Sequence, residues 1–412
     1  MKDYLSLSEA SELIGKSKET LRRWDKEGIL KATREPVSNY RVYKKTEVKA
    51  IMGSLFDDIT EDDVSNFVEP DHQYSVLELF AGAGGLAIGL EKAGLKCTAL
   101  NEIDKWACQT LRINRPTWKV LEGDIRAFEF SEYHNKVDVV TGGFPCQAFS
   151  YAGKKLGLDD ARGTLFYEFA RVVQQVNPTI CIGENVRGLL SHDKGKTLQG
   201  MISILDEIGY KVVPVKVLKA IYYRVPQKRE RLILVGIRKD IDLDFKYPKP
   251  HKKIYNLKDA LKKGELFDTD VPDSVGAKYP AYKKQVLDMV PPKGYWRDLP
   301  VEIQKEYMGG SFYLGGGKTG MARRIGWDEP SLTLTCSPAQ KQTERCHPDE
   351  TRPFTVREYA RIQTFPDEWE FAGSMAQQYK QIGNAVPVNL GEELGYAVIN
   401  FLNEYYSLSK PK

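Results

Sequence analysis

The chain has 412 residues, of which 42% are hydrophobic, enough for about two or three domains with their own cores. Its formal net charge of +4 is small, so nucleic-acid binding would depend on where the charges lie. No apolar run is long enough to cross a membrane, and residues 1–13 lack the apolar core of a signal peptide. The six cysteines form no C-x-x-C pair, which argues against a disulfide framework or a zinc knuckle and favours a reducing cytoplasm.

Residues 1–52 predict a small helical unit. A short amphipathic helix is expected over residues 7–14, and a second helix over residues 18–26 carries Arg22 and Arg23 on its polar side. Helix, tight turn and basic helix together are typical of a helix-turn-helix that binds duplex DNA. The alternative is a solvated basic helix with a tryptophan in the core.

The segment Leu21-Arg22-Arg23-Trp24, followed by Gly28-Ile29-Leu30, resembles the winged-helix domains of MerR-type regulators and excisionases. This resemblance implies DNA binding, with residues 36–43 as the wing. Residues 53–73 contain several carboxylates and no Lys or Arg, so we expect an acidic linker there.

A strand followed by a glycine-rich turn opens the next domain at residue 74. Gly82 and Gly84 belong to a G-x-G-x-x-A pattern, which is typical of nucleotide-binding turns but weak by itself. Glu102 ends the second predicted strand, where a carboxylate can accept hydrogen bonds from ribose hydroxyls, and Asp124 follows the third. These strand ends predict a nucleoside pocket; the alternative is a set of loops with ordinary turn residues.

The loop from Gly142 to Ser150 carries Cys146 directly after a short apolar run at residues 137–140. Open α/β sheets hold their chemistry at the carboxyl ends of such strands. A Gly/Pro-rich turn also offers N–H groups that favour a thiolate, the reactive form of cysteine. The alternative is a small cysteine buried in the core.

Three further charged residues are candidates for a functional site. Glu184 ends the strand predicted at residues 179–183, beside the cysteine's own strand. Arg229 and Arg231 are two positions apart and therefore lie on the same side of an extended segment. Taken alone, the arginine pair is more typical of structural ion-pair partners than of a site.

The regular alternation of strands and helices stops over residues 239–351, where Gly, Pro, Tyr and Lys dominate. Lys318, Arg323 and Arg324 lie near its glycine-rich part, a composition that suits contacts to a DNA groove, although a structural insertion is the alternative. The segment is no P-loop, because Phe312 stands where the first glycine is required. The spacing of its Cys and His residues is poor for zinc, so we expect no metal.

Six motifs in one order resemble the DNA (cytosine-5) methyltransferase family over about residues 74–405. They are Phe80-Ala81-Gly82-Ala83-Gly84-Gly85, Pro145-Cys146-Gln147, Glu184-Asn185-Val186, Gln227-Lys228-Arg229-Glu230-Arg231, Arg357-Glu358 with Arg361-Ile362-Gln363, and Gly383-Asn384-Ala385-Val386-Pro387. The resemblance implies an α/β fold of the Rossmann-like, S-adenosylmethionine-dependent methyltransferase type. Its catalytic part would span residues 74–238, residues 239–351 would be an inserted target-recognition domain, and residues 352–412 would return to the catalytic domain.

The same resemblance implies the roles of the charged residues. Cys146 would add to carbon 6 of a cytosine flipped out of duplex DNA, which makes carbon 5 nucleophilic. Glu184 would hold ring N3 and the exocyclic amine, and Arg231 would donate to O2. Arg229 would support the cysteine loop or a DNA phosphate.

The family's cofactor is S-adenosyl-L-methionine, and the matching positions predict its site. The cofactor-binding residues would be Phe80, Gly82, Gly84, Gly85, Glu102, Ile103, Asp124, Ile125, Pro145, Leu165, Asn384 and Val386. Ile103 departs from the pattern, since many relatives carry an aromatic residue there to stack on adenine. The predicted DNA contacts are Gln147, Ser150, Arg22, Arg23, Lys318, Arg323 and Arg324.

We therefore expect a cytoplasmic, site-specific DNA methyltransferase that acts as a monomer on double-stranded DNA and pairs with a cognate restriction endonuclease. A nicotinamide dehydrogenase would explain Gly82 and Glu102 but leaves Cys146 and Glu184 without a role. A DNA-binding regulator with a decayed methyltransferase fold is opposed by the intact Cys146 and Glu184.

Overall fold

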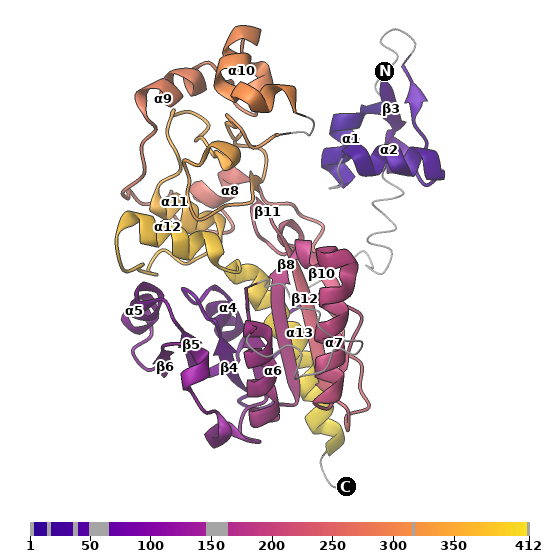
Figure 1. Ribbon diagram of the computed structural model, residues 1–412, viewed down its shortest axis with the longest axis vertical. Coiled ribbons are helices and arrows are strands. Elements are labelled where there is room, and N and C mark those ends of the chain that lie inside the picture. Colours follow the sequence, from indigo (N-terminus) through magenta and orange to yellow (C-terminus); the bar gives the residue numbers. More distant parts are fainter. Residues whose placement is uncertain are drawn as a thin grey trace. The chain divides into compact units, whose positions relative to one another are not determined.

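The computed structural model describes residues 4–14, 18–35, 40–48, 66–145, 164–314 and 318–409. They divide into two units, Met1–Ser65 and Asn66–Lys412, which are described separately here (Figure 1). Within the described residues, no helix is both long and apolar enough to cross a bilayer.

The first unit pairs two helices with a small antiparallel sheet. Its elements are β1 (Tyr4–Ser6), α1 (Leu7–Ile14), α2 (Lys18–Glu27), β2 (Thr33–Arg34) and β3 (Arg41–Lys44), with the strand order β1-β3-β2. Leu21 of α2 packs against Ala10 and Ile14 of α1, and Tyr43 of β3 belongs to the same core. An ion pair of 2.8 Å between Asp25 and Arg41 joins α2 to β3. Both helices confirm the predicted pattern. Strand β3 covers the last part of the predicted wing, whose residues 36–39 lie outside the described residues.

An eight-stranded mixed sheet organises the second unit. Its strands are β4 (Ser75–Leu79), β5 (Lys96–Glu102), β6 (Val120–Glu122), β7 (Val139–Gly142), β8 (Ile180–Val186), β9 (Tyr210–Val212), β10 (Lys216–Lys219) and β12 (Glu230–Arg238). The order is β10-β12-β8-β7-β4-β5-β6, and β9 also pairs with β12. Strands β4 to β8 run parallel, whereas β12 is antiparallel to β8. The expectation of an α/β methyltransferase fold is confirmed.

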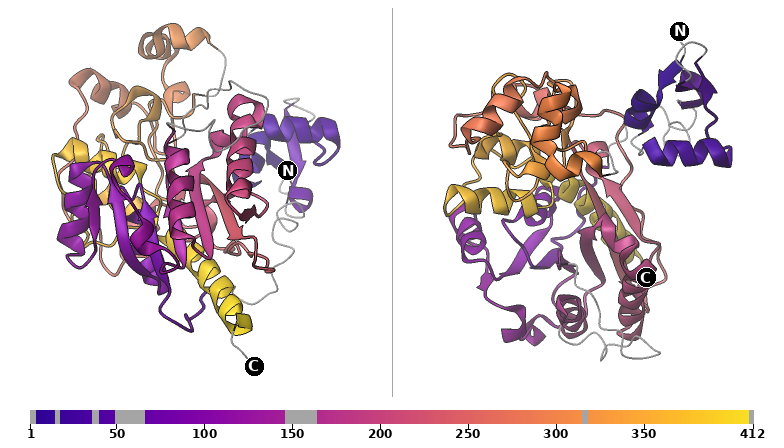
Figure 2. Two further views of the ribbon diagram at one scale, coloured as in Figure 1. Left: turned by 60° about the horizontal axis from the view of Figure 1, so that its bottom comes forward. Right: turned by 45° about the horizontal axis from the view of Figure 1, so that its top comes forward.

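Helices cover both faces of this sheet (Figure 2). They are α4 (Gly85–Ala93), α5 (Lys105–Asn114), α6 (Leu165–Val176), α7 (Lys196–Glu207) and α13 (Val388–Ser409). Because side chains alternate along a strand, Val139 and Ile182 face α4 and α13, while Val140 and Cys181 face α6 and α7. The central strands β7 and β8 are therefore apolar on both sides, as is typical of parallel sheets.

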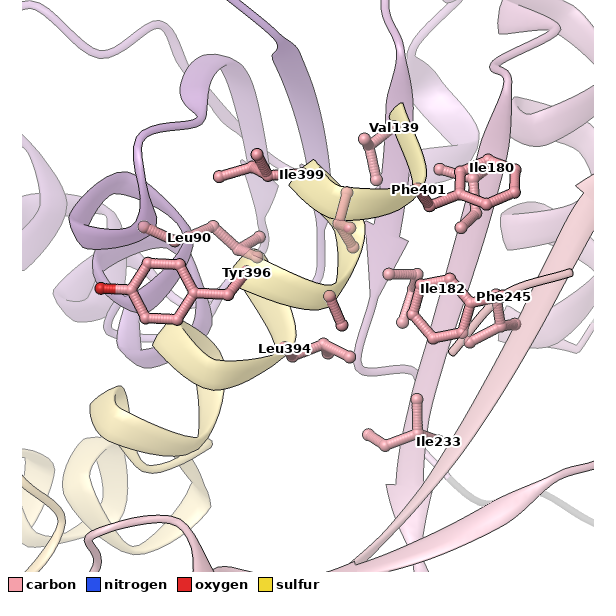
Figure 3. Close-up of a cluster of buried hydrophobic side chains, with 14 of the residues drawn as sticks. Leu90, Val139, Ile180, Ile182, Ile233, Phe245, Leu394, Tyr396, Ile399 and Phe401 are labelled. Carbon is pink, nitrogen blue, oxygen red and sulfur yellow. The ribbon is translucent and has the colours of Figure 1, made fainter. Parts of the chain in front are cut away.

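The last helix, α13, packs beside α4 on the same face of the sheet. Leu394 and Ile399 of α13 pack with Leu90 of α4 and with Ile180 of β8 (Figure 3). The two helices touch closely, since a Cβ added at Gly89 would lie 2.4 Å from the carbonyl oxygen of Val388. The chain end thus returns to the first strand, as the sequence predicts.

A less regular region connects β12 to the end of the chain. It contains α8 (Leu257–Leu261), α9 (Ala281–Asp288), α10 (Val301–Met308) and β13 (Ser331–Leu332), and the chain then continues through α11 (Val356–Ile362) and α12 (Met375–Asn384). Strand β13 pairs in parallel with the two-residue strand β11 (Gln227–Lys228). This pairing joins the end of the inserted region to the segment that carries Arg229.

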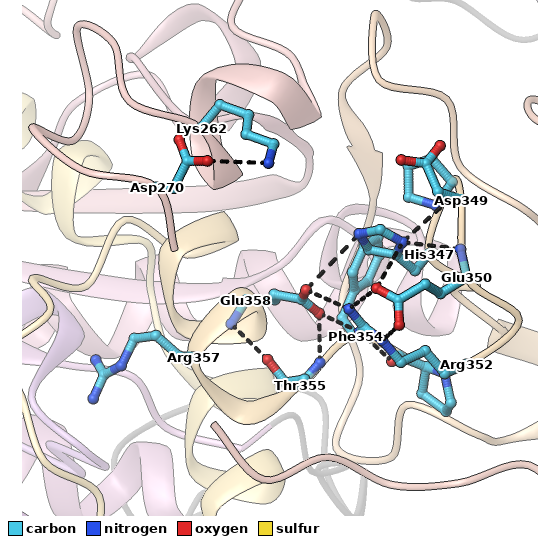
Figure 4. Close-up of polar contacts among 12 residues, drawn as sticks. Lys262, Asp270, His347, Asp349, Glu350, Arg352, Phe354, Thr355, Arg357 and Glu358 are labelled. Atoms are coloured by element: carbon cyan, nitrogen blue, oxygen red, sulfur yellow. Dashed lines mark hydrogen bonds and ion pairs between the residues drawn. The ribbon is translucent and has the colours of Figure 1, made fainter. Parts of the chain in front are cut away.

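Polar contacts fix the start of α11, where the α/β pattern resumes (Figure 4). Thr355 caps the helix and forms a capping box with Glu358. Arg352 donates to both carboxylate oxygens of Glu358, at 2.7 and 2.9 Å. The buried His347 accepts hydrogen bonds at Nδ1 from the backbone N–H groups of Asp349 and Glu350.

Candidate active site

The predicted site residues follow parallel strands that end at one edge of the sheet. Phe80 follows β4, Glu102 ends β5, and Glu184 lies near the end of β8. Cys146, Gln147 and Ser150 lie outside the described residues, and the described part of the cysteine loop ends at Pro145. The described part of this edge therefore ends one residue before the predicted nucleophile.

Glu184 and Arg231 form a close ion pair at this edge. In the antiparallel pairing of β8 with β12, Glu184 lies opposite Ile233, and Arg231 is two residues further along the same face. Arg231 Nε lies 2.5 Å from Glu184 Oε1. Both side chains are largely buried, and burial raises the pKa of Glu184 even though the two arginines oppose the shift. Such a carboxyl group can hold a proton at a higher pH than an exposed one.

The cysteine loop begins against this ion pair. A Cβ added at Gly143 would lie 3.2 Å from Glu184 Oε2, so the carboxylate contacts the loop where it leaves β7. Asn185 Nδ2 donates to the carbonyl oxygen of Phe144 at 2.8 Å. The Phe144 ring is buried against Phe166 of α6. The sequence predicts no separate role for Asn185, which lies in the Glu184-Asn185-Val186 motif, or for Phe144, which lies in the predicted cysteine loop.

Arg229 takes a different place from Arg231. Its side chain is only 2% exposed, and its guanidinium donates to the carbonyl oxygens of Leu334, at 3.2 Å, and Gly383, at 3.0 Å. Burial, together with the neighbouring charge of Arg231, lowers the pKa of Arg229 to about 9. The expectation that Arg229 contacts a DNA phosphate does not agree with this burial. Its other expected partner, the loop around Cys146, lies outside the described residues.

The glycine-rich turn after β4 is fastened to the end of β5. The backbone N–H of Gly82 donates to Glu102 Oε2 at 2.7 Å, while Oε1 accepts from the N–H groups of Ile103 and Asp104. Phe80 has a positive φ of 56°, which is uncommon for a residue with a side chain and is typical of functional turns. Predicted cofactor residues from two strand ends are thus brought into contact.

Gly82 and Gly84 serve the turn in different ways. A Cβ at Gly82 would meet no atom within 4 Å, so the turn faces open space there. At Gly84 the added Cβ would lie 2.8 Å from Leu111 Cδ2, so this glycine permits close packing under the turn. Both have a positive φ, which a residue with a side chain adopts at a cost.

The segment after α12 closes the same side. A Cβ at Gly85 would lie 2.2 Å from the carbonyl oxygen of Val386, which places Val386 directly against the start of α4. Asn384 Oδ1 lies 2.9 Å from the thiol of Cys336 and accepts its hydrogen bond. Leu165 is the first residue of α6 and is partly buried.

The predicted cofactor residues that follow β5 and β6 differ in exposure. Ile103 is 67% exposed. Asp124 caps a short 3₁₀ turn by accepting from the N–H of Arg126, with which it also forms an ion pair of 3.2 Å. Ile125 is only 2% exposed and packs in the hydrophobic core beneath the 3₁₀ turn. Ile103 thus offers an accessible apolar surface, and Asp124 is held in place by its own loop.

The basic residues that the sequence singles out in the inserted region are buried or half-buried. Arg324 is buried, and its guanidinium donates to four carbonyl oxygens and to Thr351. Arg323 forms a bidentate ion pair with the buried Glu329. Lys318 donates to the carbonyl oxygens of Ser311 and Leu314. The expected DNA contacts of Arg323 and Arg324 are corrected, because both side chains hold the loop together from within.

Arg22 and Arg23 of the first unit lie on the surface of α2. Their side chains are 44% and 67% exposed, and they pair with Glu19 and Glu27 on the same helix. Exposed pairs of this kind contribute little, so both guanidinium groups can exchange a carboxylate for a phosphate.

Profiles of two protein families match this chain. The C-5 cytosine-specific DNA methylase family matches residues 74–400, and the MerR family of regulatory proteins matches residues 6–43. The two matches coincide with the two units of the structure.

Curated relatives extend over nearly the whole chain. The chain is 61% identical to the type II methyltransferase M.Eco47II of Escherichia coli, over 98% of this chain and 97% of the relative. It is 53% identical to M.PspPI of a Psychrobacter strain, over 97% of each chain. M.Sau96I of Staphylococcus aureus is 54% identical over 83% of this chain and 79% of its own length.

Solved structures support the fold. Spodoptera frugiperda DNMT2 matches with a TM-score of 0.51 at 19% identity, over 79% of this chain and 99% of that chain. The Entamoeba histolytica methyltransferase EhMeth matches with a TM-score of 0.54 at 15% identity, over 81% and 99%. With the family match over residues 74–400, the paired Glu184 and Arg231 and the glycine-rich turn, these findings lead to one conclusion: the chain belongs to the C-5 cytosine-specific DNA methylase family.

Proposed function

We propose that this chain is the modification enzyme of a type II restriction–modification system and methylates cytosine within one short duplex sequence. The support comes from relatives named type II methyltransferases, which match over nearly their whole length. The ion pair of Glu184 with Arg231, set against the start of the cysteine loop, is the observation that carries the chemistry. Its cognate nuclease would cut the same sequence when it is unmethylated.

The reaction begins with Cys146. Carbon 5 of cytosine is a poor nucleophile, so the Cys146 thiolate forms a bond to carbon 6 and the electron pair of the 5,6 double bond becomes available at carbon 5. Once carbon 5 carries the methyl group, loss of its proton restores the double bond and expels Cys146. The base must leave the duplex for this attack, because stacked bases shield both faces of the ring.

Glu184 and Arg231 stabilise the charge that develops on the ring. With its raised pKa, the Glu184 carboxyl group can hold a proton and present it to ring N3 as Cys146 attacks carbon 6. Arg231 has a fixed geometry because Glu184 pairs with its Nε, and its remaining N–H groups can donate to O2 of the cytosine. Their pairing keeps both groups preorganised before the base arrives.

As a member of its family, the chain uses S-adenosyl-L-methionine, which supplies an electrophilic methyl group. The residues present fit this molecule. Gly82 faces open space. Among the described residues, Glu102 Oε2 accepts one backbone N–H, which leaves a lone pair for a ribose hydroxyl. Ile103 offers an exposed apolar face to a base. Asn384 and Val386 close the site from the α12 side.

The first unit provides a second contact to duplex DNA. Its match to the MerR family and the exposed Arg22 and Arg23 support this role. The contact serves either to bind the enzyme's own promoter or to add phosphate contacts near the methylation target. DNase footprinting of the full chain on both kinds of DNA distinguishes the two uses.

Bisulfite sequencing tests the proposed function. The chain is expressed in cells that lack their own cytosine methylases, and plasmid DNA is then sequenced. We expect protected cytosines in one short recurring sequence, which identifies the reaction and the target together. Soluble protein that leaves every cytosine unprotected would overturn the proposal, and protection in unrelated sequences would overturn the assignment to a type II system.

A further inference from the structure

A buried polar network lies behind the predicted cofactor site and touches none of the atoms that react. Gln227 and Gln363 form its centre, and both are fully buried. Gln227 Nε2 donates to Gln363 Oε1 at 2.9 Å, and Gln227 Oε1 accepts from the backbone N–H of Leu334 at 3.0 Å. Neither glutamine is assigned a role in the reaction proposed above.

The network reaches four consecutive carbonyl oxygens at the end of α12. Gln363 Nε2 donates to the carbonyl oxygens of Ile382, at 2.8 Å, and Ala385, at 3.2 Å. Arg229 Nη2 donates to those of Gly383, at 3.0 Å, and Asn384, at 3.4 Å. The last carbonyl groups of a helix lack partners within the helix, so these side chains supply the missing donors. Such a satisfied network fixes one backbone conformation.

The same turn is pressed against the end of the inserted region. A Cβ added at Gly383 would lie 2.3 Å from the carbonyl oxygen of Thr335, so only glycine fits there. Arg229 also donates to the carbonyl oxygen of Leu334. The turn is therefore held on one side by the strand segment that leads to Arg231 and on the other by the chain that leaves the inserted region.

We propose that Gln227, Arg229 and Gln363 are positioning residues that set residues 382–385 for cofactor binding. This inference rests on the proposed function, because Asn384 and Val386 matter only if S-adenosyl-L-methionine binds beside them. The three residues act through the backbone of the turn and contact neither the cofactor nor the base. Arg229 thereby moves from the predicted catalytic group to this positioning group.

The test replaces Gln363 with methionine, which has a similar volume but no donor. The matched control is Gln378→Met, because Gln378 Nε2 also donates to two carbonyl oxygens, those of Phe371 and Gly373, but in a turn without predicted cofactor residues. Isothermal titration of the full chain with S-adenosyl-L-homocysteine measures Kd. We expect Gln363→Met to raise Kd about tenfold or more and the control to change it less than about twofold.

Three readouts separate positioning from a loss of folding. At saturating cofactor, kcat of Gln363→Met should stay near that of the unmodified chain, while KM for the cofactor rises with Kd. Gln227→Met should shift Kd in the same direction. Equal Kd values for Gln363→Met and the unmodified chain, or a fall in kcat without a change in KM, would overturn the inference. If the unmodified chain failed to bind the cofactor analogue, the proposed function would fall and the inference with it.

Discussion

The carboxyl edge of the sheet and the inserted region both carry charged residues that stand out in the sequence, but they use them differently. At the edge, Glu184 and Arg231 pair with each other beside the cysteine loop. In the inserted region, Arg323 and Arg324 turn inward and hold the loops together. The sheet fixes where the end of each strand lies in the fold. No regular element fixes the position of a basic residue in an irregular segment. The following experiments test this difference.

The largest effect is expected from Cys146→Ala. Without the thiolate no bond forms to carbon 6, so methylation should fall by at least about 10³-fold, whereas binding to target DNA should persist. Transfer of a radiolabelled methyl group measures the first quantity, and electrophoretic mobility shift measures the second. Methylation by this variant at a rate near that of the unmodified chain would contradict the mechanism.

Replacing Glu184 with glutamine should lower kcat by about 10²-fold or more, because the amide cannot give a proton to N3. The pKa of Glu184 is raised by burial, so its protonated form persists to higher pH than in an ordinary carboxyl group. The kcat of the unmodified chain should therefore fall as the pH rises through that pKa. The variant should lack this decline, and an identical pH profile for both proteins would exclude Glu184 as the acid.

Arg324→Met tests whether the buried arginine of the inserted region has a structural role. Five hydrogen-bond acceptors would lose their buried donor, so the free energy of unfolding should fall by about 3 kcal/mol. Arg297→Met is the control, since Arg297 lies exposed in the same region. Urea denaturation measures the free energy of unfolding of both variants. A stable Arg324→Met variant with weakened DNA binding would restore the original expectation that Arg324 contacts DNA.

The parts of the fold that the sequence predicts well are those with a strong period or a local signal. The apolar strands β4 and β8 and the helices α1 and α2 follow from such patterns. The pairing of Glu184 with Arg231 does not, because it depends on the register of two antiparallel strands far apart in the chain. The burial of Arg324 could not be foreseen either, since its partners are backbone carbonyls that any sequence supplies.

A stabilising effect is expected at Glu78 in β4, which is buried and has one carboxylate oxygen with no hydrogen-bond partner among the described residues. Burial, with the nearby Glu102 and Glu184, raises the pKa of Glu78 from 4.5 to about 8. The folded chain then binds a proton that the unfolded chain releases above about pH 4.5, so stability should decline as the pH rises from there to about 8. Glu78→Gln should remove that decline and stabilise the protein by up to about 4 kcal/mol at pH 8. Thermal denaturation at several pH values measures this dependence. If the stability of Glu78→Gln and of the unmodified chain changed with pH in the same way, Glu78 would not be a buried neutral carboxyl group.

The smallest effect is expected in the first unit, where the arginines do lie on the surface. If Arg22 and Arg23 each neutralise one phosphate, Arg22→Ala with Arg23→Ala should reduce the slope of log K against log salt by about two, without a change in methylation chemistry. Arg112→Ala is the control, because Arg112 is an exposed arginine that pairs with Glu122 in the other unit. Fluorescence anisotropy of labelled duplex DNA from about 50 to 200 mM salt gives both slopes. Equal slopes for the double variant and the unmodified chain would mean that exposure alone does not make these residues a DNA contact, and that the surface of α2 serves another purpose.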